Sequence, residues 1–115
     1  MATQENCLFC SIIQGKIPAN KVYEDEVCLA FYDIDPQAPT HFLVIPKTHI
    51  PSCAGVNPDN EGVVGHIFSV IARVAEGLGL HDFRVVSNCG VQAGQSVPHL
   101  HFHVLSGRDM TWPPG

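Results

Sequence analysis

Basic residues are scarce in this sequence. Lys and Arg number six against eleven Asp and Glu, which leaves a formal net charge of -5 with histidine neutral. A groove that binds nucleic acid by neutralising phosphates needs more positive charge than this, so we expect no nucleic-acid partner. A smaller anionic ligand would have to be held by backbone N–H groups, hydroxyls and histidines.

Long apolar runs and export signals are also lacking. No run approaches the ~20 residues of a membrane-spanning helix. The polar stretch Ala2–Asn6 has neither the charged nor the apolar region of a secretory signal. The five cysteines are odd in number and accompany no such signal. We therefore expect reduced thiols in a cytoplasmic protein, with the nucleus as an additional location, and no membrane attachment.

A single domain is expected over residues 1–115, because the chain suffices for one modest core and shows no repeat or linker. Apolar spacing predicts a short helix, capped by Asn6 and ended by Gly15, and a long helix from Asn57-Pro58 to Gly79. Five strands are predicted over residues 21–24, 27–33, 41–46, 83–87 and 99–105. Together these elements make an α+β domain with a mainly antiparallel sheet.

The last predicted strand carries histidines at alternate positions, His99, His101 and His103, with apolar residues between them. Because successive side chains of a strand point to opposite faces, the three imidazoles share one face while the apolar residues enter the core. Burying imidazoles costs free energy unless each ring nitrogen has a partner. The row therefore indicates a functional site, either a metal centre or a catalytic one.

Catalysis at phosphorus fits this row better than a metal centre. Rings at every second position cannot by themselves supply the fourth ligand or the outer hydrogen bonds of a zinc site. Imidazole is a good nucleophile near neutral pH, and its attack on phosphorus gives an N–P bond similar in energy to a substrate's P–N or anhydride bond. Just upstream, Gly94-Gln95-Ser96 offers an anion backbone N–H groups and a hydroxyl.

A second candidate site is the pair Cys7 and Cys10, which has the spacing of half a tetrahedral zinc site. Redox pairs share this spacing, so the pair alone does not decide between the two. No second Cys-x-x-Cys occurs, so any further ligands must be histidines. Cys28, Cys53 and Cys89 stand outside any ligand pattern, and we expect ordinary buried or surface thiols there.

Nearly the whole chain resembles the histidine triad family, and within it the Hint branch. The resemblance is carried by residues 23–26, 31–34, 36–47, 94–97, 99–104 and 107–108, and by the ending Trp112–Gly115. Hint proteins are homodimeric purine nucleoside phosphoramidases. The resemblance therefore implies a HIT-like domain that dimerises into a continuous ten-stranded sheet. It also implies hydrolysis of substrates such as adenosine 5′-phosphoramidate to AMP and an amine, through a covalent nucleotidyl-histidine.

The resemblance also implies roles for individual residues. His101 would be the nucleophile, His103 would contact the phosphate and assist the leaving group, and His99 and His41 would complete the histidine network. The nucleotide would be held by apolar walls for the base (Leu8, Phe9, Phe31, Ile34), a carboxylate for the ribose (Asp33), and polar groups for the phosphate and leaving group (Asn88, Gly94, Gln95, Ser96). Phe9, Phe31 and Ile34 fit a purely structural place in the core as well.

The same resemblance implies a zinc site and a role for the C-terminal tail. A structural zinc, dispensable for the chemistry, would be bound by Cys7, Cys10, His49 and His99, with unliganded thiols as the alternative. Trp112 would line the leaving-group pocket of the neighbouring subunit; alternatively it packs on its own domain.

Two other functions remain open from the sequence. One is an AMP-binding regulatory or adaptor protein, and the other is a dinucleoside polyphosphate hydrolase, as in another branch of the family. Intact His101 and His103 favour an enzyme, and the Trp112–Gly115 ending favours the Hint branch.

Overall fold

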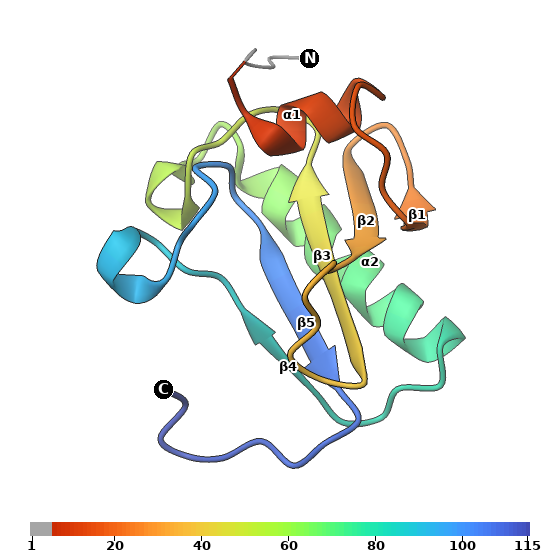
Figure 1. The fold of residues 1–115 in the computed structure, drawn as a ribbon. Coiled ribbons are helices and arrows are strands. Elements are labelled where there is room, and N and C mark those ends of the chain that lie inside the picture. The colour runs from red at the N-terminus through yellow and green to blue at the C-terminus, as the bar shows by residue number, and fades with distance from the viewer. Residues whose placement is uncertain (1–5) are drawn as a thin grey trace.

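Five strands form one antiparallel sheet in the order β1-β2-β3-β5-β4 (Figure 1). The structure is a computed structural model and describes residues 6–115. The strands are β1 (Lys21–Glu24), β2 (Cys28–Tyr32), β3 (Thr40–Pro46), β4 (Phe83–Val86) and β5 (Phe102–Ser106). The predicted α+β class and strand number are confirmed, and every pairing is antiparallel. The single domain predicted over residues 1–115 begins with five residues that lie outside the described part.

The central strand β3 is buried on both faces because a helix covers each one. Phe42 and Val44 pack in the core beneath the long helix α2 (Glu61–Gly77), whose buried residues are Ile67, Val70, Ile71, Val74 and Ala75. Leu43 and Ile45 point the other way and pack with residues of the short helix α1 (Leu8–Ile13). Figure 1 shows α2 behind the sheet and α1 in front of its upper end. The continuous apolar run of β3 is thus explained by two covered faces.

Both helices begin later than the sequence predicts. The N-cap of α1 is Cys7, whose Sγ accepts the Cys10 N–H at 3.4 Å, so the sulfur takes the capping place predicted for Asn6. Helix α2 begins after Asn60, because the Asn57 N–H donates to Asn60 Oδ1 at 2.8 Å and closes a turn ahead of the helix. The predicted cap at Asn57-Pro58 is therefore wrong by one turn. Gly15 and Gly79 follow the helices with positive φ, as predicted.

The histidine row is only partly a strand. β5 begins at Phe102, so His99 and His101 precede it, because the Leu100 N–H donates to Ile50 O (2.6 Å) instead of to a neighbouring strand. The alternation of faces nevertheless continues through this segment. Leu100, Phe102 and Val104 all lie in the core under α2, which leaves the histidines for the opposite side.

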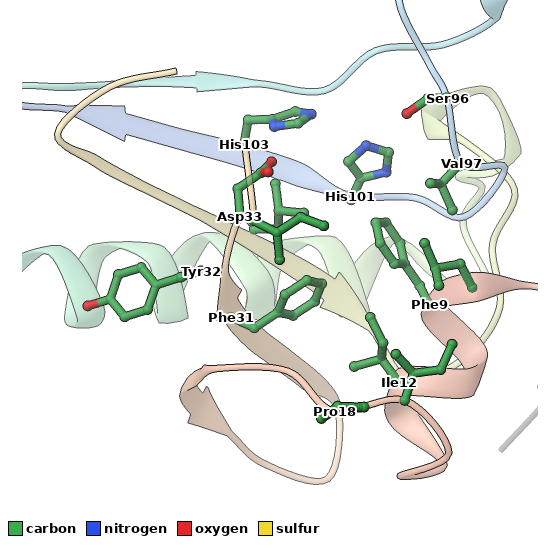
Figure 2. A pocket seen from close by; sticks show the side chains of 14 residues that line it. Phe9, Ile12, Pro18, Phe31, Tyr32, Asp33, Ser96, Val97, His101 and His103 are labelled. Atoms are coloured by element: carbon green, nitrogen blue, oxygen red, sulfur yellow. The ribbon is translucent and has the colours of Figure 1, made fainter. Parts of the chain in front are cut away.

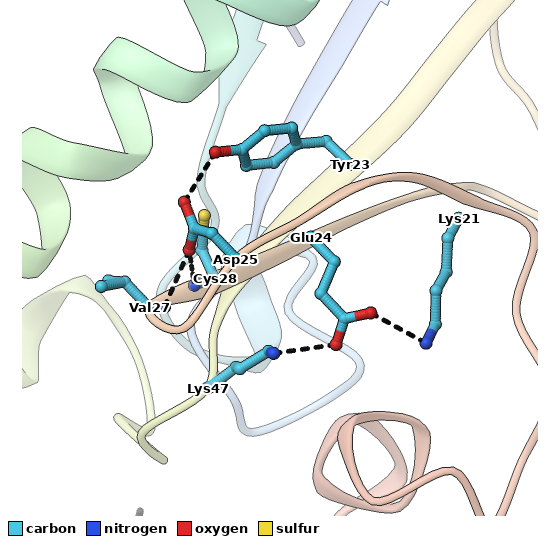
Figure 3. Close-up of polar contacts among 7 residues, drawn as sticks. All are labelled: Lys21, Tyr23, Glu24, Asp25, Val27, Cys28 and Lys47. Carbon is cyan, nitrogen blue, oxygen red and sulfur yellow. Dashed lines mark hydrogen bonds and ion pairs between the residues drawn. The ribbon is translucent and has the colours of Figure 1, made fainter.

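The turn between β1 and β2 is fastened by Asp25 (Figure 3). Its Oδ1 accepts the Val27 and Cys28 N–H groups, each at 2.8 Å, and its Oδ2 accepts the Tyr23 hydroxyl at 2.8 Å. His66 Nε2 of α2 contacts the same Oδ2 at 2.6 Å, so the turn is tied to the helix. Burial acts to raise the pKa of Asp25, but these hydrogen bonds outweigh it and hold the pKa well below its usual range.

Beside this turn, Glu24 pairs with Lys47 at 2.8 Å and with Lys21 at 3.0 Å, which ties the edge strand β1 to the end of β3 (Figure 3).

Two short 3₁₀ turns lie in the connections between the longer elements, namely η1 (Cys53–Gly55) and η2 (Val91–Ala93). Within residues 6–115, no helix is both long enough and apolar enough to cross a membrane.

Candidate active site

A cavity of about 290 Å³ opens on the face of the sheet that α1 covers (Figure 2). This volume is near the lower end of the usual range for small-molecule sites, about 300–1,000 Å³. Its walls are mostly apolar, with a few polar groups among them. The lining residues are Leu8, Phe9, Ile12, Ile17, Pro18, Phe31, Tyr32, Asp33, Ile34, Leu43, Ser96, Val97, His101 and His103.

His101 lines this cavity, yet only 4% of its surface is exposed. Its Nδ1 lies 2.7 Å from the carbonyl oxygen of His99. A carbonyl only accepts, so Nδ1 carries the proton and the neutral ring keeps its lone pair on Nε2. The Phe9 ring meets the imidazole edge-on, with centroids 5.1 Å apart, and restricts its rotation. The His99 carbonyl therefore fixes the tautomer of neutral His101 that leaves Nε2 free to act as a nucleophile.

His103 is held in the opposite tautomer by a chain of hydrogen bonds. The Gln37 N–H donates to His41 Nδ1 at 3.0 Å, so the proton of neutral His41 is on Nε2. His41 Nε2 then donates to His103 Nδ1 at 2.9 Å, which leaves the proton of His103 on Nε2. His101 and His103 stand side by side with ring centroids 5.0 Å apart. The cavity thus receives one ring with a free lone pair and one ring with an N–H donor.

Burial favours the neutral form of both supporting rings. It lowers the pKa of His103 to about 4, with the neighbouring His101 and His41 adding to the effect. Burial also lowers the pKa of His41, against the opposing influence of the Asp33 carboxylate, whose Oδ2 lies 3.5 Å from His41 Nε2. An anion bound beside His103 would favour its protonated form, because an opposite charge raises the pKa of an imidazole.

His99 belongs to a separate cluster and does not line the cavity. Its Nε2–H donates to the Pro46 carbonyl at 2.8 Å, so its Nδ1 lone pair faces Cys7 Sγ at 3.3 Å. His49 Nδ1 lies 3.3 Å from Cys10 Sγ. Burial lowers the pKa of His99 to about 4 and also lowers the pKa of His49. The four side chains expected to bind zinc are therefore together, with their ligand atoms all within 4.8 Å of one another.

The loop before the histidine row is shaped by Gln95. Its Oε1 accepts the Gly90 N–H at 2.9 Å and its Nε2 donates to Pro51 O at 2.7 Å. Gly94, with φ of 97°, adopts a conformation that other residues rarely take. Of the four residues expected near the phosphate, Ser96 lines the cavity, whereas Asn88, Gly94 and Gln95 do not. Their direct contact with a ligand stays a prediction.

Sequence reasoning missed six of the lining residues, namely Ile12, Ile17, Pro18, Tyr32, Leu43 and Val97. Ile12 follows Leu8 by one helical turn, so helical spacing could have identified it. Val97 adjoins Ser96 and could have been inferred from it. Ile17 and Pro18 lie in the connection between α1 and β1, where no periodicity marks them.

Trp112 is 82% exposed and does not line the cavity of its own chain. The alternative that it packs on its own domain is therefore wrong for the single chain. Its neighbour Thr111 is anchored, because the Arg84 guanidinium donates to the Thr111 carbonyl at 3.0 Å. The expected place of Trp112 in a neighbouring subunit stays a prediction.

A family model of the HIT domain matches residues 14–110. The chain belongs to the HIT family. It is 47% identical over 112 residues to an uncharacterized HIT-like protein of Synechocystis, a match that covers 96% of this chain and 98% of the relative.

Solved HIT structures share the fold of this chain. The crystal structure of a HIT family hydrolase from Legionella pneumophila superposes with a TM-score of 0.93 at 50% identity, covering 96% of this chain and 100% of that one. A histidine triad protein from Clostridium difficile superposes with a TM-score of 0.90 at 44% identity, covering 94% of this chain and 96% of that one. The α+β architecture described above is thus that of HIT structures.

Proposed function

We propose that this HIT protein hydrolyses purine nucleoside phosphoramidates, such as adenosine 5′-phosphoramidate, to AMP and an amine. The observation that carries the proposal is the pair of opposite tautomers at the cavity wall. His101 offers a lone pair on Nε2, and His103 offers a proton on Nε2, each fixed by a neighbouring hydrogen bond. The relative from Legionella pneumophila is described as a hydrolase, which agrees with this chemistry.

The reaction would proceed in two balanced steps. His101 Nε2 attacks phosphorus and the P–N bond breaks. His103, which the bound phosphate helps to protonate at Nδ1 once His41 turns its Nε2–H away, gives its Nε2 proton to the departing nitrogen and keeps the Nδ1 proton. The amine leaves, and the nucleotidyl group remains on a cationic His101 ring whose Nδ1–H points to the His99 carbonyl. Neutral His103 then takes a proton from water, which attacks phosphorus and releases AMP together with neutral His101.

The rest of the cavity suits a nucleoside. The apolar walls formed by Phe9, Phe31 and Ile34 would cover the base. Asp33 would accept hydrogen bonds from the ribose hydroxyls, because it lines the cavity and its side chain is 18% exposed. Ser96 would bind the phosphate with its hydroxyl.

Replacing the nucleophile tests the proposal. His101→Ala should abolish turnover of adenosine 5′-phosphoramidate while AMP still binds, because the other contacts to AMP persist. Isothermal titration with AMP and a steady-state assay of amine release measure the two quantities. His103→Ala should slow turnover less severely, since general acid–base help contributes about 10²–10⁴-fold. The exposed His81 provides the control, because His81→Ala should change neither quantity.

The same assays distinguish the alternative functions. AMP binding without turnover of any substrate would identify an AMP-binding regulatory protein. Faster turnover of diadenosine polyphosphates than of the phosphoramidate would identify a dinucleoside polyphosphate hydrolase. Near-normal phosphoramidate turnover by His101→Ala would contradict the role of His101 itself.

We further propose that Cys7, Cys10, His49 and His99 bind a structural zinc ion. Two thiols and two imidazoles are a common donor set for tetrahedral zinc, whose ligand atoms lie about 3.3–3.8 Å apart. The separations of 3.3 Å and 3.6 Å between sulfur and Nδ1 agree with this spacing. The Pro46 carbonyl holds His99 with Nδ1 toward the site, as an outer hydrogen bond does for a ligand. The ion would join α1, the loop after β3 and the segment before β5.

Metal analysis tests the zinc proposal. Protein purified without chelator should contain about one zinc per chain, as expected for a four-ligand structural site. Removing the zinc should lower the melting temperature more than it lowers turnover, because none of the four ligands is the proposed nucleophile. Absence of zinc together with free reaction of all five thiols would contradict the site.

The homodimer expected from the Hint resemblance is also proposed. β4 is an edge strand, so its unpaired backbone groups could join a second copy and extend the sheet to ten strands. Exposed apolar side chains lie on α2 and β4, including Phe68 (47% exposed) and Phe83 (38% exposed). Sedimentation equilibrium measures the oligomeric state, and Phe68→Glu should weaken the dimer.

A further inference from the structure

Two exposed cysteines from distant parts of the sequence meet at the surface. The Cys89 thiol donates to Ser52 Oγ at 3.4 Å, and the same Oγ accepts the Ala54 N–H at 3.2 Å. Cys89 therefore lies against the start of η1, where Cys53 stands between Ser52 and Ala54. The Cys53 thiol is also near enough to the Cys89 sulfur to help lower the pKa of Cys89. Both thiols are exposed, and neither is in a disulfide.

The remaining cysteines are in different surroundings. Cys7, Cys10 and Cys28 are buried, and burial raises the pKa of Cys28 to about 12. The pKa of Cys89 is lowered, mainly by the Ser52 hydroxyl and then by the Ala54 N–H and the Cys53 thiol, all of which favour a thiolate. An accessible thiol with a lowered pKa beside a second accessible thiol is the arrangement of a reactive cysteine and its resolving partner.

We propose that Cys53 and Cys89 form a reversible disulfide on exposure to a two-electron thiol oxidant, such as hydrogen peroxide. The Cys89 thiolate attacks one peroxide oxygen, the O–O bond breaks, and a sulfenic acid and water result after uptake of one proton. The Cys53 sulfur then attacks the Cys89 sulfur, the S–O bond breaks, and hydroxide leaves as water with the Cys53 proton. Two thiols and one peroxide thus give one disulfide and two waters. A low-molecular-weight thiol reverses the reaction by exchange.

The disulfide would lie beside the loop that leads to the cavity. Gln95 already links the same two segments, because it contacts the Pro51 carbonyl and the Gly90 N–H. A covalent link would add a second connection between them, which would last until the disulfide is reduced. We therefore expect the backbone from Gly90 to Gly94 to open less often after oxidation, and its amide hydrogens to exchange more slowly.

Peptide mapping tests the proposal directly. The full chain, purified with its metal, is treated with stoichiometric hydrogen peroxide, free thiols are alkylated without unfolding, and the digest is analysed by mass spectrometry. We expect a peptide linked through Cys53 and Cys89, lighter by two hydrogen atoms than its separate parts, which disappears after treatment with dithiothreitol. Hydrogen exchange of the oxidised and reduced proteins, measured on the same samples, should slow by severalfold over Gly90–Gly94.

Serine variants provide the controls. Cys53→Ser should leave Cys89 to accumulate as a sulfenic acid, which dimedone traps, whereas Cys89→Ser should largely abolish the reaction of Cys53 with peroxide. Both are conservative changes at exposed positions, so both variants should retain the wild-type melting temperature. Separate oxidation of the two cysteines in the wild-type protein, without a linked peptide, would overturn the proposal. So would links only between different chains, or a link between Cys7 and Cys10 alone.

Discussion

His41 offers a specific test of how His103 is held. We compare His41→Phe, which keeps a planar ring without nitrogen atoms, with His41→Gln, which keeps one acceptor and one donor on a shorter side chain. In the wild-type protein, His41 accepts the Gln37 N–H and donates to His103 Nδ1. The Phe variant removes both hydrogen bonds, so His103 is free to place its proton on either nitrogen. The Gln variant can restore both.

The magnitude follows from the hydrogen bonds that are lost. A single hydrogen bond contributes about 0.5–1.5 kcal/mol net. Since about 1.36 kcal/mol corresponds to tenfold in rate, His41→Phe should lower kcat by about 2–13-fold. The Gln37 N–H is also left without its acceptor, which should lower the free energy of unfolding by about 1–3 kcal/mol. His41→Gln should recover most of both losses.

Turnover of adenosine 5′-phosphoramidate and urea denaturation measure these two effects. His66→Phe is the matched control, because His66 also forms a short contact, with Asp25, but lies on α2 outside the cavity. It should lower stability without changing kcat. Two results would refute the reasoning: wild-type kcat in His41→Phe, or a loss as complete as that of His101→Ala. The first would show that His103 needs no support, and the second that His41 itself takes part in the reaction.

Two further predictions concern regions outside the cavity. Asp25→Asn should lower the free energy of unfolding by about 1.5–3 kcal/mol, because hydrogen bonds to a charged acceptor are replaced by weaker ones. Because the pKa of Asp25 is lowered in the folded protein, its carboxylate stabilises the fold fully above the unfolded pKa of about 3.9 and progressively less as the pH falls below that value. The free energy of unfolding of the Asn variant, measured with urea, should therefore depend less on pH in that range. Removing residues 111–115 should alter the preference among small and aromatic amine leaving groups while AMP affinity stays nearly unchanged, if Trp112 serves a neighbouring subunit. An equal loss on every substrate would instead mean that the tail supports the fold.

Much of the fold could be predicted from the sequence because its signals are local. The apolar run His41–Pro46 predicted a strand, and Gly79 marked the end of the long helix. The structure confirms the strand and gives Gly79 a positive φ. Helix starts were less predictable, because several side chains compete to cap them. The Cys7 sulfur took the place predicted for Asn6, and the turn closed by Asn60 displaced the predicted start at Asn57.

The candidate site, like the fold, could be predicted from the sequence only in part. Alternation along the chain predicted that His99, His101 and His103 face away from the core beneath α2. The Cys7–Cys10 spacing predicted either a metal site or a redox pair. Only the tertiary structure decided which nitrogen of each neutral ring carries the proton. The carbonyls of Pro46 and His99 and the amide of Gln37 assign the protons of the histidine rings.

The physical reason lies in the range of the interactions. Periodicity acts between residues a few positions apart, so the sequence displays it. A tautomer depends on a single donor or acceptor within about 3 Å, and that group can come from any part of the chain. Pro46 and His99 are far apart in sequence, as are Cys53 and Cys89, and each pair meets only because β3 and β5 lie side by side and bring their flanking loops to the same end of the sheet.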